Sequence, residues 1–85
     1  MGRRRLEPDE GLWIRPCNGI HTFWMRFSID VLFLDRELKV VKVIHSLSPF
    51  RISIPVPQAK SVIEVPAGTA KTFSIETGTR LRIER

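Results

Sequence analysis

The fold follows from one stretch of sequence, Phe27-Ser28-Ile29-Asp30-Val31-Leu32-Phe33-Leu34. Apolar residues alternate along one face of this stretch, namely Phe27, Ile29, Val31 and Phe33. Its second half is apolar on the other face as well, because Leu32 and Leu34 lie there. A strand with two apolar faces has to be covered on both sides. We therefore predict a central strand over 27–34 that is buried on two sides.

The segment that follows predicts a hairpin with the central strand. Asp35-Arg36-Glu37 is a short polar connector, and an apolar stretch over 38–44 comes directly after it. The apolar residues of that stretch change faces between Val40 and Val41. A strict period of two cannot bury them all on one side. We expect either a bulge near Val40-Val41 or burial of both faces.

Further strands are predicted on either side of this hairpin. Residues 12–14 form a short apolar run that Arg15-Pro16 closes, and 59–65 form another that ends at Pro66-Ala67-Gly68. Residues 80–84 follow a turn at Gly78 and alternate between apolar and charged side chains. Each of these segments is short, which is typical of a small β domain.

The segment over 50–57 alternates regularly. We expect its apolar residues to face inward, namely Phe50, Ile52, Ile54 and Val56. Pro55 and Pro57 cannot donate hydrogen bonds to a neighbouring strand. This segment is therefore expected at an edge of the sheet or as an extended cover over it.

One short helix is predicted near 69–74, with Thr69 as its N-cap and Phe73 or Ile75 packed against the sheet. The predicted fold class is mainly β, a small sandwich or partly open barrel of about five to six short strands with this one helix.

The length of 85 residues predicts a single domain over 1–85, because two independent cores do not fit. Residues 1–9 are expected to be flexible. No stretch approaches the roughly 20 apolar residues of a membrane helix, and the basic N-terminus lacks the apolar core of a signal peptide. The single Cys17 excludes an internal disulfide framework. The cytoplasm is the expected location, although an upstream region could carry an export signal.

The charge balance favours an anionic partner. Fourteen Lys and Arg against nine Asp and Glu give a net charge of +5. The cations are dispersed, however, and the one run, Arg3-Arg4-Arg5, lies at the terminus. Dispersed charge is typical of a solvated basic surface, so nucleic acid is a possible partner but not the favoured one. No membrane partner is expected.

Three blocks of this sequence resemble one family. They are Gly11–Phe27, which includes Phe23-Trp24-Met25, then Ile29–Asp35, and then Ala59–Gly68. Together they resemble the domain of unknown function 192 family (DUF192). The resemblance implies a compact, mainly β fold of bacterial and archaeal proteins with no established biochemical activity. It therefore supports the architecture and supplies no reaction.

Members of that family usually begin further upstream, with an opening strand and a short helical segment. The resemblance therefore implies an exposed sheet edge, through which two copies could pair as a homodimer. It also places Glu64 and Gly68 in a recurring Glu-x-x-x-Gly pattern, which favours a turn-bracing role for Glu64. A carboxylate within an apolar strand otherwise needs an exposed edge, a cation or backbone donors.

Cys17 and His21 lie four residues apart, a spacing at which a thiolate and an imidazole can bind zinc or form a nucleophile–base pair. A structural zinc site needs four ligands, and no Cys-x-x-Cys or His-Glu-x-x-His motif supplies the others. We expect no metal and no cofactor. The favoured interpretation is a buried Cys17 and a His21 that hydrogen-bonds within its own loop.

The bulkiest side chains of the chain gather at Trp13 and Phe23-Trp24-Met25, with polar groups close by in sequence. A cluster of large side chains in a small domain is typical of a core, but polar residues next to the cluster indicate a ligand cleft. Arg26 and Asp30 are four positions apart, an even spacing that can place both on one face of a strand, so an ion pair between them is the structural alternative. The candidate ligand-binding residues are Asn18, His21, Thr22, Trp24, Met25, Arg26, Asp30 and Glu64.

Three functions stay open at this point, and the sequence assigns no reaction. The first is a binding module with a cleft beside the 17–26 loop, for a small anionic or polar ligand or for a peptide or protein partner. The second is a hydrolase-type enzyme that uses His21, Asp30 and Glu64. The third is a weak nucleic-acid binder that acts through the basic surface.

Overall fold

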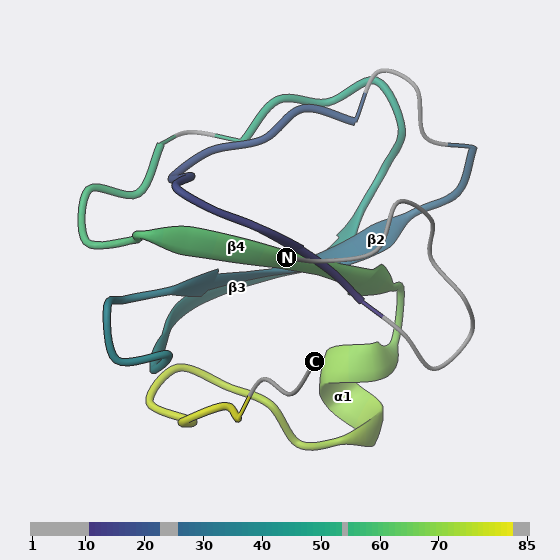
Figure 1. Cartoon of the computed structure of the whole chain (residues 1–85). Helices are drawn as coiled ribbons and strands as arrows, with labels where there is room; N and C mark the ends of the chain where they lie inside the picture. Colours follow the sequence, from purple (N-terminus) through teal and green to yellow (C-terminus); the bar gives the residue numbers. More distant parts are fainter. Residues whose placement is uncertain (1–10, 23–25, 54, 83–85) are drawn as a thin grey trace.

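The computed structural model describes residues 11–22, 26–53 and 55–82 (Figure 1). These residues form one open antiparallel sheet and one short helix. The elements are β1 (Leu12–Ile14), β2 (Ile29–Leu34), β3 (Val40–Leu47), β4 (Ser61–Pro66) and α1 (Thr69–Thr72). The strand order is β1-β4-β2-β3, so β2 and β4 are the inner strands. The mainly β class with one short helix is confirmed.

β2 is the centre of the molecule, as the sequence predicts. It pairs with β3 on one side and with β4 on the other, and all six of its residues are buried. Ile29, Val31 and Phe33 belong to an apolar cluster on one face, whereas Leu32 and Leu34 belong to a second cluster on the other. Both clusters remove apolar surface from water, which is the main stabilising effect in a domain of this size.

One face of the sheet lies under two extended segments, which we call the covering layer. The first is 15–22, and the second is 48–60, of which 48–53 and 55–60 are described. Backbone hydrogen bonds join its two segments, from the Val56 amide to the Asn18 carbonyl (2.7 Å) and from the Ser53 amide to the Ile20 carbonyl (2.9 Å). Figure 1 shows these segments side by side above the sheet. The covering layer supplies Cys17 and Ile20 to the cluster around Val31.

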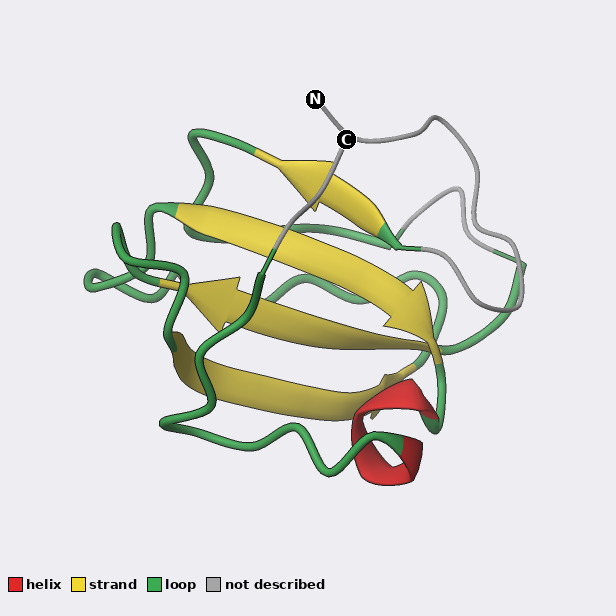
Figure 2. Cartoon of the chain, turned by 60° about the horizontal axis from the view of Figure 1, so that its bottom comes forward, coloured by secondary structure: helices red, strands yellow, loops and turns green. Residues whose placement is uncertain are grey.

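The opposite face is covered by α1 and the segment after it (Figure 2). Ala70 of α1 is fully buried against Leu32, and Ile75 and Leu81 pack against the same cluster. The segment also extends the sheet locally, because Lys39 and Arg80 form an isolated bridge. The strand expected over 80–84 is represented by this bridge in the described residues, and the sheet has four regular strands there.

The predicted hairpin is present, and β3 extends further than expected, to Leu47. Phe33 pairs with Lys42 and Leu34 pairs with Val40, so the register skips Val41. The bulge expected near Val40-Val41 is therefore confirmed. It lets the apolar residues change faces without breaking the pairing with β2.

The expected orientation of the 50–56 segment is wrong for two of its residues. Phe50 is 72% exposed and Ile52 is 69% exposed, whereas Ser53 and Val56 are buried. The reason is the pairing with 20–22: the Ile20 amide donates to Ser53 Oγ at 2.9 Å, which turns Ser53 inward and Ile52 outward. Ile54 lies outside the described residues.

The helix is shorter than predicted and is capped differently. It spans Thr69–Thr72, and its N-cap is Gly68 with a left-handed φ of 94°. Thr69 as the N-cap is therefore wrong. Ile75 packs on the sheet as expected, while Phe73 is 68% exposed. The described residues contain no helix that is long and apolar enough to cross a membrane.

Candidate functional site

Asp30 is a structural carboxylate. It is completely buried, and three backbone amides donate to it: Ser46 to Oδ1 at 2.9 Å, Gly68 to Oδ2 at 3.0 Å and Ala70 to Oδ2 at 2.9 Å. These charge-assisted bonds satisfy backbone amides at the start of α1 and at the end of β3. The Asp30 carboxylate, and not the predicted N-cap Thr69, accepts hydrogen bonds from the amides at the start of α1.

This arrangement removes Asp30 from the expected ligand site. The expected ion pair with Arg26 is wrong, since the Asp30 oxygens accept from backbone amides and Arg26 is exposed. Asp30 also lies in the sheet face that α1 covers, whereas Val31 and its register partner Glu64 face the covering layer. The two carboxylates expected to cooperate therefore lie on opposite faces of the sheet.

Thr22 is also structural. It is buried, and its hydroxyl donates to the Ser48 carbonyl at 2.7 Å and accepts from the Arg51 amide at 2.9 Å. Backbone bonds join the same segments, from the Thr22 amide to the Arg51 carbonyl (2.8 Å) and from the Phe50 amide to the Thr22 carbonyl (2.9 Å). Thr22 thus fixes the conformation of the 48–51 turn.

Glu64 is buried in β4 between Leu12 of β1 and Val31 of β2. Burial among these apolar neighbours raises the pKa of the Glu64 carboxyl above its usual value, and the charge of His21 lowers it by a smaller amount. A buried carboxyl that stays protonated more readily can act as a proton donor or a hydrogen-bond donor. The structure thus brings Glu64 and His21 within electrostatic reach of each other.

The turn-bracing role expected for Glu64 is not what the structure contains. The Gly68 amide donates to Asp30 at 3.0 Å, so Asp30 braces the turn after β4. Glu64 lies in the middle of β4, buried between β1 and β2.

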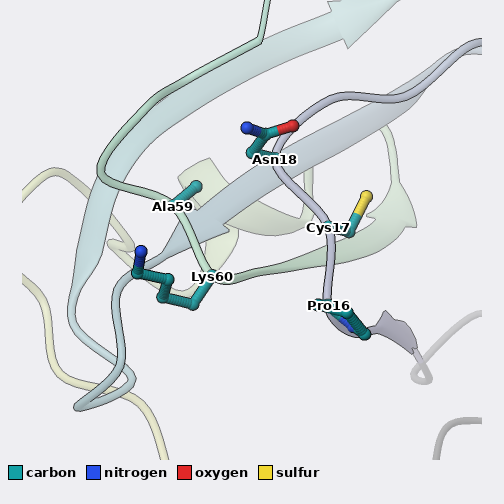
Figure 3. A pocket seen from close by; sticks show the side chains of 5 residues that line it. All are labelled: Pro16, Cys17, Asn18, Ala59 and Lys60. Carbon is teal, nitrogen blue, oxygen red and sulfur yellow. The ribbon is translucent and has the colours of Figure 1, made fainter.

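A surface hollow of about 320 Å³ lies in the covering layer. Its walls are Pro16, Cys17 and Asn18 on one segment and Ala59 and Lys60 on the other (Figure 3). The Cys17 amide donates to the Lys60 carbonyl at 3.1 Å, which holds the two walls together. The Cys17 thiol donates to the Gly19 carbonyl at 2.9 Å. The amide of Asn18 and the ammonium of Lys60 are the polar groups that the hollow offers to a ligand.

The predicted site residues therefore separate into four places. Asn18 lines the hollow, His21 lies within electrostatic reach of Glu64, and Asp30 and Thr22 stabilise the fold. Arg26 is exposed, and Trp24 and Met25 lie outside the described residues. Sequence reasoning missed Lys60. Its signal was weak: it is one dispersed cation, although it immediately precedes a strand on a turn closed by the Ala59 amide and the Val56 carbonyl.

In 11–22, 26–53 and 55–82, no three His, Cys, Asp or Glu side chains gather as a metal-binding group. The guanidinium carbon of Arg15 lies over the Trp13 ring, 4.3 Å from the ring centroid.

Comparison with known proteins identifies the family. The DUF192 family model, described as "Uncharacterized ACR", matches residues 1–83. This chain belongs to that family. The resemblance found in the sequence is thereby confirmed, and the DUF192 description carries no biochemical activity.

Archaeal relatives agree with this assignment. A UPF0127 protein of Pyrococcus abyssi is 48% identical over 62 residues, which are 73% of this chain and 52% of that protein. A UPF0127 protein of Pyrococcus horikoshii is 43% identical over 63 residues, which are 74% of this chain and 54% of that protein. The chain thus spans about half the length of the curated relatives it matches.

A solved structure shows the same fold. A protein of unknown function from Novosphingobium aromaticivorans matches with a TM-score of 0.79 and 18% sequence identity. The match covers 98% of this chain and 64% of that one. At this identity the likeness concerns the fold alone.

Proposed function

We propose that this DUF192 protein is a small binding module whose ligand is a small anion, held in the hollow between Asn18 and Lys60. The observation that carries the proposal is the hollow itself, a space of about 320 Å³ that places an amide and an ammonium beside apolar walls. Ligand pockets typically combine apolar walls with a few fixed polar groups.

The charge of the covering layer supports an anionic ligand. Its described residues include the cations Arg15, Arg51 and Lys60 and no Asp or Glu. An anion that enters the hollow therefore meets no acidic neighbour in this layer. A positive potential of this kind concentrates anions and speeds their association.

The fixed backbone around the hollow also supports a binding role. The Cys17 amide is bonded to the Lys60 carbonyl, and the Val56 amide is bonded to the Asn18 carbonyl. A ligand would therefore find the walls already in place, so binding would not have to order the backbone.

The hydrolase alternative has less support, because Asp30 is bonded to backbone amides on the face opposite Glu64. A general acid and a general base have to reach the same reacting group. The pair of Glu64 and His21 remains, and it does not line the hollow.

The proposal is tested by calorimetric titration of the full chain with inorganic phosphate and with acetate. We expect saturable binding that Lys60→Gln weakens at least about tenfold, since one charge-assisted contact is lost. Lys71→Gln, which removes an exposed cation on α1, serves as the matched control and should bind like the unmodified chain. Heat that does not saturate, or equal loss in both variants, would overturn the proposal.

A further inference from the structure

A pair of large apolar side chains stands out from the covering layer. Phe50 and Ile52 are both more than two-thirds exposed, although the sequence pattern predicts that both face inward. We call Phe50, Arg51 and Ile52 the ridge. Single exposed apolar residues are common on protein surfaces, but two adjacent to an exposed arginine indicate a contact surface.

The ridge is held rigidly from beneath. The buried Thr22 bonds to the segment through its amide, its carbonyl and its hydroxyl, at 2.7 to 2.9 Å. The Ser53 amide, directly after the ridge, donates to the Ile20 carbonyl at 2.9 Å. These bonds fix the backbone on both sides of Ile52 and hold its side chain in the outward orientation.

The backbone at Phe50 is strained. Its φ is 62°, in the left-handed region that bulky side chains rarely adopt. Strain of this kind persists only where the surrounding bonds impose it, and it often accompanies a functional role. The chain here uses a strained residue to hold an aromatic ring in solvent.

The covering layer that carries the ridge contains cations and no acidic residue among its described positions. Arg51 belongs to the ridge, and Arg15 and Lys60 lie elsewhere in the covering layer. The acidic residues within the described chain lie in other places: Asp30 and Glu64 are buried, Asp35 and Glu37 are on the hairpin, and Glu76 follows α1. The ridge therefore combines two exposed apolar side chains with one exposed arginine, and no described acidic residue of the covering layer lies beside it.

This combination fits an anionic lipid surface better than a nucleic acid. Single-stranded nucleic acids are bound by aromatic faces on which bases stack, and Ile52 offers no such face. The interfacial region of a bilayer accepts aliphatic and aromatic side chains alike, and its anionic headgroups attract arginine.

We propose that the ridge docks this protein on an anionic lipid surface, with Phe50 and Ile52 at the level of the headgroups and acyl chains and with Arg51 at the phosphates. Two side chains and one local cation give a weak, reversible association that falls as salt rises. The proposal is independent of the ligand site at Lys60.

The test uses the full chain and sedimentation with vesicles. We expect binding to vesicles of phosphatidylglycerol and phosphatidylcholine and much weaker binding to vesicles of phosphatidylcholine alone. Phe50→Ser and Ile52→Ser should each reduce the vesicle partition coefficient about tenfold, because each removes one inserted side chain. Phe73→Ser is the matched control: Phe73 is equally exposed but follows α1 on the other face of the sheet, so its loss should have no effect.

A second pair of variants tests the charge. Arg51→Gln should reduce binding to the anionic vesicles several-fold, whereas Arg36→Gln, on the exposed hairpin, should not. Equal binding to both kinds of vesicle, or equal effects of the Phe50 and Phe73 variants, would overturn the proposal. So would salt-sensitive binding of a single-stranded oligonucleotide that requires Phe50 but not Ile52, without vesicle binding. Far-ultraviolet circular dichroism of each variant checks that the fold is retained.

Discussion

Each face of the sheet buries one carboxyl, and the surroundings of the two carboxyls differ. Asp30 of β2 pairs in register with Val65, and its neighbour Val31 pairs with Glu64, so the two carboxylates are one position apart along the sheet. Asp30 faces α1 and receives three backbone hydrogen bonds. Glu64 faces the covering layer, and burial raises the pKa of its carboxyl.

The difference shows that backbone donors decide the role of a buried carboxyl. On the α1 face, Ser46 lies at a second register shift of β3, between the pairs Ile29–Leu47 and Val31–Ile44. Its amide and the amides at the start of α1 donate to Asp30, and the charge stabilises the fold. On the other face, the strands that flank Glu64 already use their amides in the sheet, so the charged form is disfavoured. The carboxyl on the α1 face is therefore structural, whereas the carboxyl beneath the covering layer has a raised pKa.

The largest effect is expected from Asp30→Ala. The change leaves three buried amides without their acceptor, which should lower the free energy of unfolding by about 3–5 kcal/mol. Urea denaturation followed by circular dichroism measures it. A small domain has about 5–15 kcal/mol in total, so the variant should be close to unfolding. A loss below about 1 kcal/mol would show that the three bonds do not stabilise the fold.

A smaller loss is expected from Thr22→Val, which keeps the shape of the side chain and removes its hydroxyl. The Arg51 amide and the Ser48 carbonyl lose their partner, so the free energy of unfolding should fall by about 1–3 kcal/mol. Amide hydrogen exchange should increase at Arg51 and Phe50 more than in β2. Uniform change along the chain would contradict the local role of Thr22.

The fold was predictable where it follows from a local sequence pattern. It was not predictable where pairing with a distant segment determines which way a side chain points. β2, its hairpin and the bulge at Val41 follow from alternation within a few residues. The amides that donate hydrogen bonds to Asp30 belong to residues 16, 38 and 40 positions away, which no spacing in the sequence reveals. The outward orientation of Ile52 likewise depends on pairing with His21, which is remote in sequence.

The candidate site was also predictable only where the residues are close in sequence. Asn18 was found because it lies in a polar loop beside bulky residues, and Lys60 was missed because its partner wall is more than forty positions away. Asp30 and Thr22 were assigned to a ligand because polar residues near an aromatic cluster can serve either purpose. Only their hydrogen-bond partners separate the two roles.

A pH-dependent effect of moderate size is expected from Glu64→Gln. The pKa of Glu64 is raised in the folded chain, so the folded state holds its proton more tightly than the unfolded state. Stability should therefore fall as the pH rises through the window from the ordinary carboxyl pKa to the raised one, and then level off. Urea midpoints measured across this window should show a flatter profile for Glu64→Gln. Parallel profiles would contradict the raised pKa.

The smallest effect is expected from Asp35→Asn, with the opposite sign. The Lys39 amide, followed by the Glu37 amide, lowers the pKa of this exposed carboxyl. Its contribution to stability is therefore present above the ordinary carboxyl pKa and is lost as the pH falls through the lowered one. The stability of the variant should therefore fall slightly less on acidification than that of the unmodified chain. Unchanged acid sensitivity of the urea midpoint would show that the turn does not use the charge.

The most direct test of the contrast between the faces is a map of amide chemical shifts during titration of the ¹⁵N-labelled full chain with inorganic phosphate. We expect saturable changes at residues 16–18 and 59–60, with none at the amides of Gly68 and Ala70 that hold Asp30. Changes centred on Gly68 and Ala70, or no saturable change in the covering layer, would contradict the assignment of ligand binding to that layer.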